Sequence, residues 1–345
     1  MGISRRAASV QPSVTLAISA KAKQMKAEGR NVISLSAGEP DFDTPEHIKE
    51  AAVRALKEGF TKYTPATGTP ELKKAICEKF ARDNGLEYTP SQVIVNCGAK
   101  HTIYLAIQAL VEEGDEVVVP VPYWVSYPEQ VRLAGGRPVF APSGNDLKLK
   151  PEALREVLSP RTKAVIVNSP CNPSGVVYTK EELEALGEVL AEARVWVISD
   201  EIYEKLVYDG QEHFSIASVV PELKKRTVVV NGVSKAYAMT GWRIGYAAGP
   251  EEVISAMGKI QSQETSNPNS IAQAAALAAL TGPQECVGEM VRAFDERRRY
   301  VVGRLQAMPG VSCGVPKGAF YVFPDVSGLG RDSVALCSWI LEELE

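Results

Sequence analysis

The chain has 345 residues and a formal net charge of −4, and 45 % of its residues are apolar against 23 % charged. This balance is ordinary for a globular protein, and the length favours roughly two domains. The mild acidity gives no electrostatic reason to expect a nucleic-acid partner, and no run of ~18 apolar residues predicts a membrane span.

The N-terminal sequence MGISRRAASVQPSV lacks the apolar core of a secretory signal. The six cysteines show no Cys-x-x-Cys spacing and no neighbouring group of histidines. We therefore expect reduced thiols, no metal site and a cytoplasmic location.

Apolar β-branched runs alternate with amphipathic segments along most of the chain. In chain order, we expect strands within SQVIVNCGAK, EVVVPVPYW, KAVIVNSPCNPSG, VWVISDEIYEKLVY, TVVVNGVSKAY and WRIGYAAG. Helices are expected within KHTIYLAIQALVEEG and KEELEALGEVLAEA, where apolar residues recur at helical spacing. Continuous Val/Ile strands joined through helices predict a mostly parallel sheet with both faces covered, an α/β fold.

The two ends of the chain have a different pattern. A long charged helix, VGEMVRAFDERRRYVVGRLQAM, precedes an expected strand, GAFYVFP, and an apparent helix at the end of the sequence, VALCSWILEELE. We predict that residues 1–40 form an N-terminal arm and part of a smaller α+β domain, that 41–282 form the large domain, and that 283–345 form the remainder of the small domain, apparently truncated.

Polar or aromatic residues follow nearly every predicted strand. Because ligands in parallel α/β sheets bind beyond the carboxyl ends of the strands, these endings predict a binding site. Lys235 and Ser234 follow one strand, and Arg243, which can clamp a phosphate, opens the next. Asp200 ends another strand, where a buried carboxylate needs a cationic partner.

Three further features are predicted to lie at the same carboxyl edge of the sheet. Ala99 and Lys100 open a helix after Gly98, and backbone amides at a helix N-terminus favour a phosphate. Trp124 offers an indole face to a flat ring. Asn172, in an Asn-Pro turn, and Tyr203 supply polar groups.

Each feature alone has an ordinary interpretation: a surface lysine, a helix-capping aspartate, a plain turn or a core tryptophan. Together they match pyridoxal phosphate, which has an aldehyde for Lys235, a pyridinium nitrogen for Asp200, a ring face, a phenolic oxygen and a phosphate.

The motifs Asn172-Pro173-Ser174-Gly175, Asp200-Glu201-Ile202-Tyr203 and Ser234-Lys235 through Gly245 resemble those of the class I/II aminotransferases of fold type I. SAGEPDFDTPEHI and TKYTPATGTPELK resemble the bacterial and archaeal aspartate aminotransferase branch. The resemblance implies a seven-stranded, mostly parallel sheet in a large cofactor-binding domain. It implies transfer of an amino group from an L-amino acid, expected to be aspartate, to a 2-oxo acid, expected to be 2-oxoglutarate.

The resemblance also implies roles for individual residues. Lys235 is the catalytic residue and forms the imine with the cofactor. The other implied cofactor-binding residues are Ala99, Lys100, Trp124, Asn172, Asp200, Tyr203, Ser234 and Arg243, together with Tyr63, which reaches the neighbouring subunit of a homodimer with shared active sites. The implied substrate-binding residues are Gly38, Trp124, Asn172, Lys100, Thr15 and Ser262.

Relatives usually continue beyond Glu345 and carry there the arginine that binds the substrate α-carboxylate. No residue in this sequence matches that arginine, so we expect either an incomplete sequence or weak substrate binding. Four alternatives stay open: a carbon–sulfur β-lyase on the same fold, an aromatic or prephenate-type aminotransferase on the same fold, a ligand-sensing domain, and a chain that acts only through dimerisation.

Overall fold

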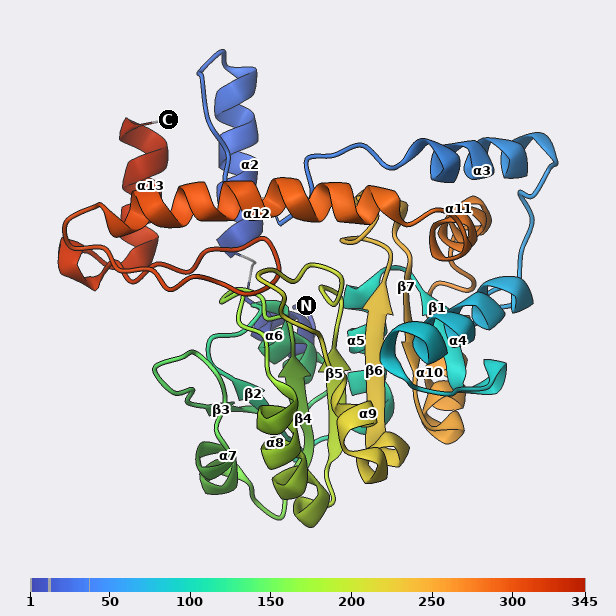
Figure 1. The fold of residues 1–345 in the computed structure, drawn as a ribbon. Helices are drawn as coiled ribbons and strands as arrows, with labels where there is room; N and C mark the ends of the chain where they lie inside the picture. The colour runs from blue at the N-terminus through green and yellow to red at the C-terminus, as the bar shows by residue number, and fades with distance from the viewer. Residues whose placement is uncertain (1, 12–13, 37, 345) are drawn as a thin grey trace.

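The computed structural model describes residues 2–11, 14–36 and 38–344. A seven-stranded sheet lies at the centre of this part of the chain (Figure 1). In spatial order its strands are β1 (Val93–Asn96), β7 (Gly245–Ala248), β6 (Thr227–Gly232), β5 (Trp196–Asp200), β4 (Thr162–Asn168), β2 (Glu116–Pro120) and β3 (Arg137–Ala141). Only β7 runs antiparallel to its neighbours, so the predicted mostly parallel seven-stranded α/β sheet is confirmed.

Helices surround the sheet and continue above it. They are α1 (Arg5–Ser9), α2 (Val14–Ala27), α3 (Glu46–Lys57), α4 (Pro70–Asn84), α5 (Ala99–Leu110), α6 (Ser126–Leu133), α7 (Pro151–Val157), α8 (Lys180–Ala193), α9 (Ile216–Val219), α10 (Glu251–Glu264), α11 (Ser270–Thr281), α12 (Glu285–Gln306) and α13 (Ser333–Glu343). None of the described helices is both long and apolar enough to cross a membrane.

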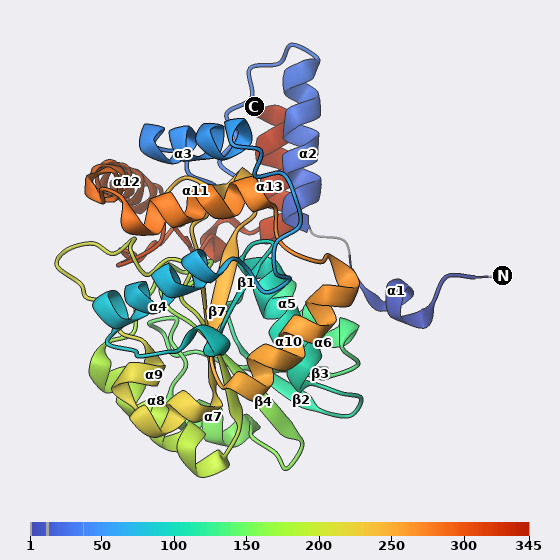
Figure 2. The same cartoon turned by 90° about the vertical axis from the view of Figure 1, so that its right-hand side faces the viewer.

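The valine-rich strands are explained by burial on both faces of the sheet. In β2, Val117 and Val119 pack into a core with α5, α6 and α10, whereas Val118 packs into the opposite core with α7 and α8. Figure 2 shows these helices on the two sides of the sheet. Alternate side chains of one strand reach opposite faces, so a strand buried on both sides has to be apolar throughout.

The edge strand β3 lacks the continuous apolar run of the buried strands. Its residues are partly exposed, and it was not among the runs from which strands were expected. The other edge strand, β1, is buried along its length, whereas β3 is incompletely covered, so the sequence of β3 need not be continuously apolar.

The expected strand GAFYVFP, residues 318–324, is wrong in the described structure. This segment forms one isolated bridge, between Gly318 and Val207, and otherwise uses its backbone to dock on loops of the sheet. Both Lys317 and Gly318 donate their amides to the Gly175 carbonyl, and Ala319 donates to Leu206. Its neighbours are therefore the turns around the sheet edge rather than another strand.

The two ends of the chain meet. Leu341 of α13 packs against Ala22 and Met25 of α2, and Lys21 forms an ion pair with Glu342. Figures 1 and 2 both show α2 and α13 side by side, away from the sheet. This contact supports our proposal that 1–40 and 283–345 share a small domain beside a large domain of 41–282, a division that stays a prediction.

Candidate active site

Loops at the carboxyl edge of the parallel strands surround a cavity of about 580 Å³. This edge points towards α12 in Figure 1. The cavity brings together ten of the residues predicted for the site: Gly38, Ala99, Lys100, Trp124, Asn172, Asp200, Tyr203, Ser234, Lys235 and Arg243.

Lys235 lies three residues after β6, and its amine is inside the cavity. The Nζ atom donates a hydrogen bond to the Gly38 carbonyl at 2.5 Å and lies 5.6 Å from the centre of the Tyr203 ring. Burial, with the nearby positive charge of Arg243, lowers the pKa of Lys235 to about 8. About a tenth of this amine is therefore neutral at pH 7, and so nucleophilic and basic, far more than for an ordinary lysine.

Asp200, the last residue of β5, is only 4 % exposed. Its Oδ2 accepts a hydrogen bond from the Tyr127 hydroxyl at 2.6 Å, and its Oδ1 accepts one from the Ile202 amide at 3.3 Å. Burial raises the pKa of Asp200 to about 6, although the Tyr127 hydrogen bond works against the increase. The carboxylate is thus largely ionised at neutral pH, with no cation hydrogen-bonded to it among the described residues.

The start of α5 forms an anion cradle with Arg243. Gly98, at a backbone φ of +87°, turns the chain from β1 into α5, and a Cβ atom there would lie 2.3 Å from the Arg243 Nη2. The guanidinium donates to the carbonyls of Thr240 at 2.8 Å and Cys97 at 3.3 Å. Neither the Ala99 amide nor the Lys100 amide donates to a described residue, so both are free for a ligand.

Three polar side chains converge on the opposite wall. The hydroxyls of Tyr203 and Tyr321 form a hydrogen bond, and the Asn172 amide donates to Tyr321 at 3.4 Å. Burial, and then contact with Tyr321, raises the pKa of Tyr203 well above its usual value, so both hydroxyls stay protonated. A Cβ on Gly38 would lie 2.7 Å from the Tyr321 hydroxyl, so glycine is needed for this close approach.

Trp124 lies four residues beyond the end of β2, in the loop before α6. Its ring packs edge-to-face on Tyr127, with ring centres 5.3 Å apart, and the Lys100 amine lies 5.0 Å from the indole. Burial and the positive charge of Arg243 lower the pKa of Lys100. Lys100 forms no ion pair with an acidic side chain of the described residues, so its amine is placed to attract an anionic group.

Three predicted residues do not line this cavity. Tyr63 is 91 % exposed and is not among the residues that line the cavity of its own chain. Ser262, in α10, donates its hydroxyl to the Lys259 carbonyl on the exposed surface. The backbone of Thr15 belongs to α2, but its side chain is outside the described part of the structure.

Two tyrosines of the site were not among the predicted residues. Tyr321 lies in the segment expected to be a strand, and Tyr127 follows an ordinary-looking serine at the start of α6. Both act through contacts with residues 73 to 149 positions away, so only their polarity in an apolar setting could have drawn attention to them.

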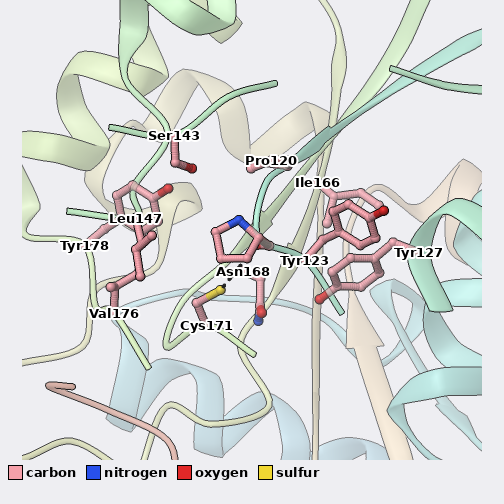
Figure 3. Close-up of a pocket in the computed structure, with 11 residues that line it drawn as sticks. Pro120, Tyr123, Tyr127, Ser143, Leu147, Ile166, Asn168, Cys171, Val176 and Tyr178 are labelled. Carbon is pink, nitrogen blue, oxygen red and sulfur yellow. Dashed lines mark hydrogen bonds between the residues drawn. The ribbon is translucent and has the colours of Figure 1, made fainter. Parts of the chain in front are cut away.

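A second, much smaller cavity adjoins the first, and Tyr123 lines both. Figure 3 shows Tyr127, Tyr178 and Cys171 around it. Its volume of about 20 Å³ is close to that of one water molecule, so it has no room for a substrate.

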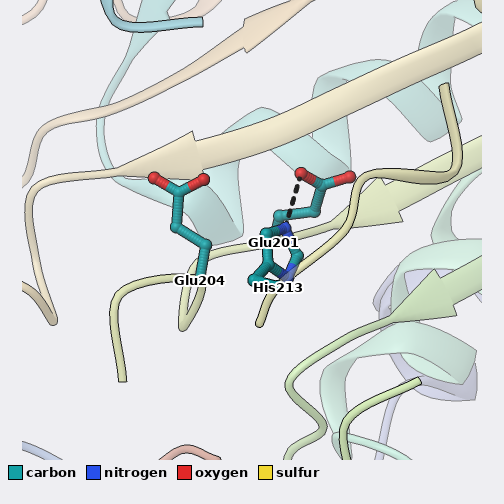
Figure 4. Close-up of side chains that lie close together, drawn as sticks. All are labelled: Glu201, Glu204 and His213. Carbon is teal, nitrogen blue, oxygen red and sulfur yellow. Dashed lines mark hydrogen bonds and ion pairs between the residues drawn. The ribbon is translucent and has the colours of Figure 1, made fainter. Parts of the chain in front are cut away.

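Three residues of the kinds that bind metal ions lie close together in the part of the chain that follows Asp200 (Figure 4). Glu201, Glu204 and His213 place one potential ligand atom each within 4.8 Å of one another. Glu201 already accepts hydrogen bonds from Ser199 and Ser215, at 2.7 and 2.6 Å, and contacts His213 at 3.2 Å.

Glu204 of the same group forms an ion pair with Lys79 and accepts from Asn84 at 2.9 Å. Protein partners thus occupy these carboxylates, and the group anchors the segment that follows β5.

The fold and site define an α/β enzyme whose cavity holds a partly neutral lysine, a buried carboxylate and an anion cradle. Residues 30–345 match the family model "Aminotransferase class I and II". The chain therefore belongs to the class I and II aminotransferases and is an enzyme of that family.

Relatives and solved structures with high sequence identity are also named as aminotransferases. The chain is 57 % identical over 327 residues to an aspartate aminotransferase of Geobacillus stearothermophilus, covering 94 % of this chain and 83 % of the relative. It is 55 % identical to an aspartate/prephenate aminotransferase of Cereibacter sphaeroides, covering 97 % of this chain and 87 % of the relative. The solved structure of Thermus thermophilus aspartate aminotransferase with maleate superposes with a TM-score of 0.94 at 49 % identity, covering 99 % of this chain and 90 % of that one.

Proposed function

We propose that this aminotransferase uses pyridoxal phosphate to transfer the amino group of L-aspartate to 2-oxoglutarate. The observation that carries the proposal is the single cavity that holds Lys235, Asp200 and Arg243. The names of the relatives support aspartate as the donor.

The residues of the cavity fit this cofactor. The free amides of Ala99 and Lys100, with Ser234 and Arg243, suit its phosphate, and Gly98 leaves the space for Arg243 that a side chain would fill. Asp200 is a buried carboxylate without a protein cation hydrogen-bonded to it, which suits a protonated ring nitrogen.

When bound, pyridoxal phosphate supplies an aldehyde that accepts an amine and a ring that takes up the electron pair released at the substrate Cα. Lys235 would hold the aldehyde before the amino acid enters. Its freed Nζ, with a pKa of about 8, would then remove the Cα proton. Asp200 would keep a proton on the ring nitrogen, while Asn172 and Tyr203 orient the ring oxygen and Trp124 covers the ring face.

Lys100 supports a substrate with two carboxylates. Its amine lines the cavity and has no acidic partner among the described residues, so a distal carboxylate of aspartate or 2-oxoglutarate would be attracted to it. We assign Gly38 and Asn172 to the α-carboxylate side. Thr15 and Ser262 stay predicted substrate contacts.

We further propose an active homodimer. The 91 % exposure of Tyr63 supports a contact outside its own chain, and a partner's cavity would accept it near the phosphate. Tyr63→Phe should then weaken cofactor binding without changing the dimer that sedimentation measures. The cytoplasmic location stays a prediction.

A panel of amino donors with 2-oxoglutarate tests the main proposal. Aspartate should give the highest kcat/KM, and the purified protein should show a visible-edge absorbance band that Lys235→Ala removes. Release of pyruvate and ammonia from cystathionine without any oxo acid would instead favour the β-lyase, which the named relatives do not favour.

Prephenate is a second candidate amino acceptor. The name of the Cereibacter sphaeroides relative supports it. Replacing 2-oxoglutarate by prephenate in the same assay, with aspartate as donor, decides whether this chain accepts it.

A further inference from the structure

We propose that Tyr127 is a positioning residue for Asp200: its hydroxyl orients the carboxylate and keeps it ionised towards the cofactor's ring nitrogen. This inference rests on the proposed function, because it assigns Asp200 a ring nitrogen as partner. Tyr127 itself does not line the large cavity.

Packing locks the Tyr127 ring in place. The side chain is 2 % exposed, and its ring meets Trp124 edge-to-face at an interplanar angle of 86°. The Tyr127 amide donates to the Trp124 carbonyl at 3.0 Å, at the start of α6. The hydroxyl therefore has little freedom to leave Asp200.

The hydrogen bond between Tyr127 and Asp200 is short and has a defined direction. Its length of 2.6 Å falls in the range of hydroxyl–carboxylate bonds, which are roughly twice as strong as neutral ones. Burial, together with the negative charge of Asp200, raises the pKa of Tyr127 well above 10, so Tyr127 stays the donor at any working pH.

Tyr127 is the main group that offsets the burial of Asp200. The ionisable groups facing Asp200 are Tyr127 from α6, Cys171 from the turn after β4, Glu201 and Tyr203 from its own segment, Lys235 from the turn after β6, and Tyr321 from the C-terminal part. Of these, Tyr127 contributes the only side-chain hydrogen bond to the carboxylate, and Lys235 adds a weaker attraction.

Loss of the hydroxyl should therefore raise the pKa of Asp200 into the neutral range. A protonated Asp200 carries no negative charge and cannot hold a proton on a ring nitrogen. Cofactor binding should then weaken most at low pH and recover as the pH rises and Asp200 ionises again.

Tyr178→Phe is a matched control for Tyr127→Phe. Tyr178 is also a buried tyrosine on the small cavity of Figure 3, but its hydroxyl accepts from the Leu149 amide at 2.8 Å and does not contact Asp200. Both substitutions remove one buried hydroxyl, so a difference between them reports on Asp200.

The first test measures the dissociation constant of pyridoxal phosphate, titrated into each apoprotein at pH 6.5, 7.5 and 8.5. In Tyr127→Phe the constant should rise roughly tenfold at pH 6.5 and much less at pH 8.5, whereas Tyr178→Phe should follow the wild type. Equal pH profiles for the three proteins would overturn the role of Tyr127. Failure of the wild type to bind would instead overturn the proposed function.

The second test needs no cofactor. The raised pKa of Asp200 means that its ionisation on going from pH 5 to pH 8 destabilises the folded apoprotein, and Tyr127→Phe should enlarge this effect. The difference in unfolding free energy from the wild type should therefore be larger at pH 8 than at pH 5. A constant difference in Tyr127→Phe, like that expected for Tyr178→Phe, would contradict the proposal.

Discussion

Asp200, the last residue of β5, and Glu204, four residues further along the chain, are both buried carboxylates, yet their surroundings differ. Asp200 faces the large cavity, and among the described residues its carboxylate accepts hydrogen bonds from one hydroxyl and one amide. Its pKa is raised to about 6, with burial as the main cause. Burial also acts to raise the pKa of Glu204, but the charges of Lys79, His213 and Lys205 outweigh it and the pKa is lowered.

The same contrast applies to the two buried lysines. Lys79 is 2 % exposed and pairs with Glu204, whereas Lys235 donates to a backbone carbonyl, forms no ion pair with the described residues and has a lowered pKa. A buried charge that is fully paired supports the fold, and one left without its counter-charge is available to a ligand. One short segment, from Asp200 at the end of β5 to Glu204, carries one carboxylate of each kind.

The largest expected effect is on catalysis at Lys235. Lys235→Ala should lower kcat for aspartate with 2-oxoglutarate by at least about 10³-fold, because the base and the cofactor's covalent anchor are both lost. Steady-state turnover measures this, with circular dichroism of the variant as the check on folding. Retention of a tenth of the wild-type kcat would contradict the assignment.

Exchanging each carboxylate for its amide should separate the two regions. Glu204→Gln should lower the free energy of unfolding by roughly 3–5 kcal/mol, because it leaves Lys79 buried without a counter-charge. Asp200→Asn should change stability far less but weaken cofactor binding. Urea unfolding and cofactor titration of both variants test this, and similar stability losses in the two would remove the contrast.

Replacing Lys235 and replacing Lys79 should change the free energy of unfolding of the apoprotein in opposite directions. A pKa lowered from 10.5 to about 8 means that the folded chain binds fewer protons at Lys235 than the unfolded chain between these values, so stability rises with pH there. Lys235→Met should remove this rise and stabilise the apoprotein by roughly 3 kcal/mol at pH 7. Lys79→Met should destabilise it by leaving Glu204 unpaired.

Denaturant unfolding of the wild type and both variants at pH 7 and pH 10 measures these changes in the free energy of unfolding. A Lys235→Met apoprotein less stable than the wild type at pH 7 would show that the amine is favourably paired after all.

The smallest expected effect concerns the anion cradle. Gly98→Ala would place a Cβ 2.3 Å from Arg243 and should raise the dissociation constant of pyridoxal phosphate about tenfold by displacing the guanidinium. Gly85→Ala is the matched control, since Gly85 also has a positive φ, of +64°, but open space around its Cβ position. Equal affinities of the two variants for pyridoxal phosphate would contradict the need for space beside Arg243.

The sequence by itself determined the parallel sheet and the main polar residues of the cavity. Buried strands need continuous apolar runs, and in parallel sheets the polar residues that follow these runs meet at one edge, so Lys235, Asp200 and Asn172 were predictable from local pattern. The half-exposed edge strand β3 carries too weak a pattern to be predicted in this way.

Only the tertiary structure decided which side chains complete the site. The Tyr127–Asp200 and Asn172–Tyr321 hydrogen bonds join residues 73 and 149 positions apart, and no local pattern encodes such contacts. The pairing of Glu204 with Lys79 is equally non-local, spanning α4 and the β5 loop. Whether a buried charge is paired depends on what folding brings next to it, and this separates the supporting carboxylate from the one that faces the ligand.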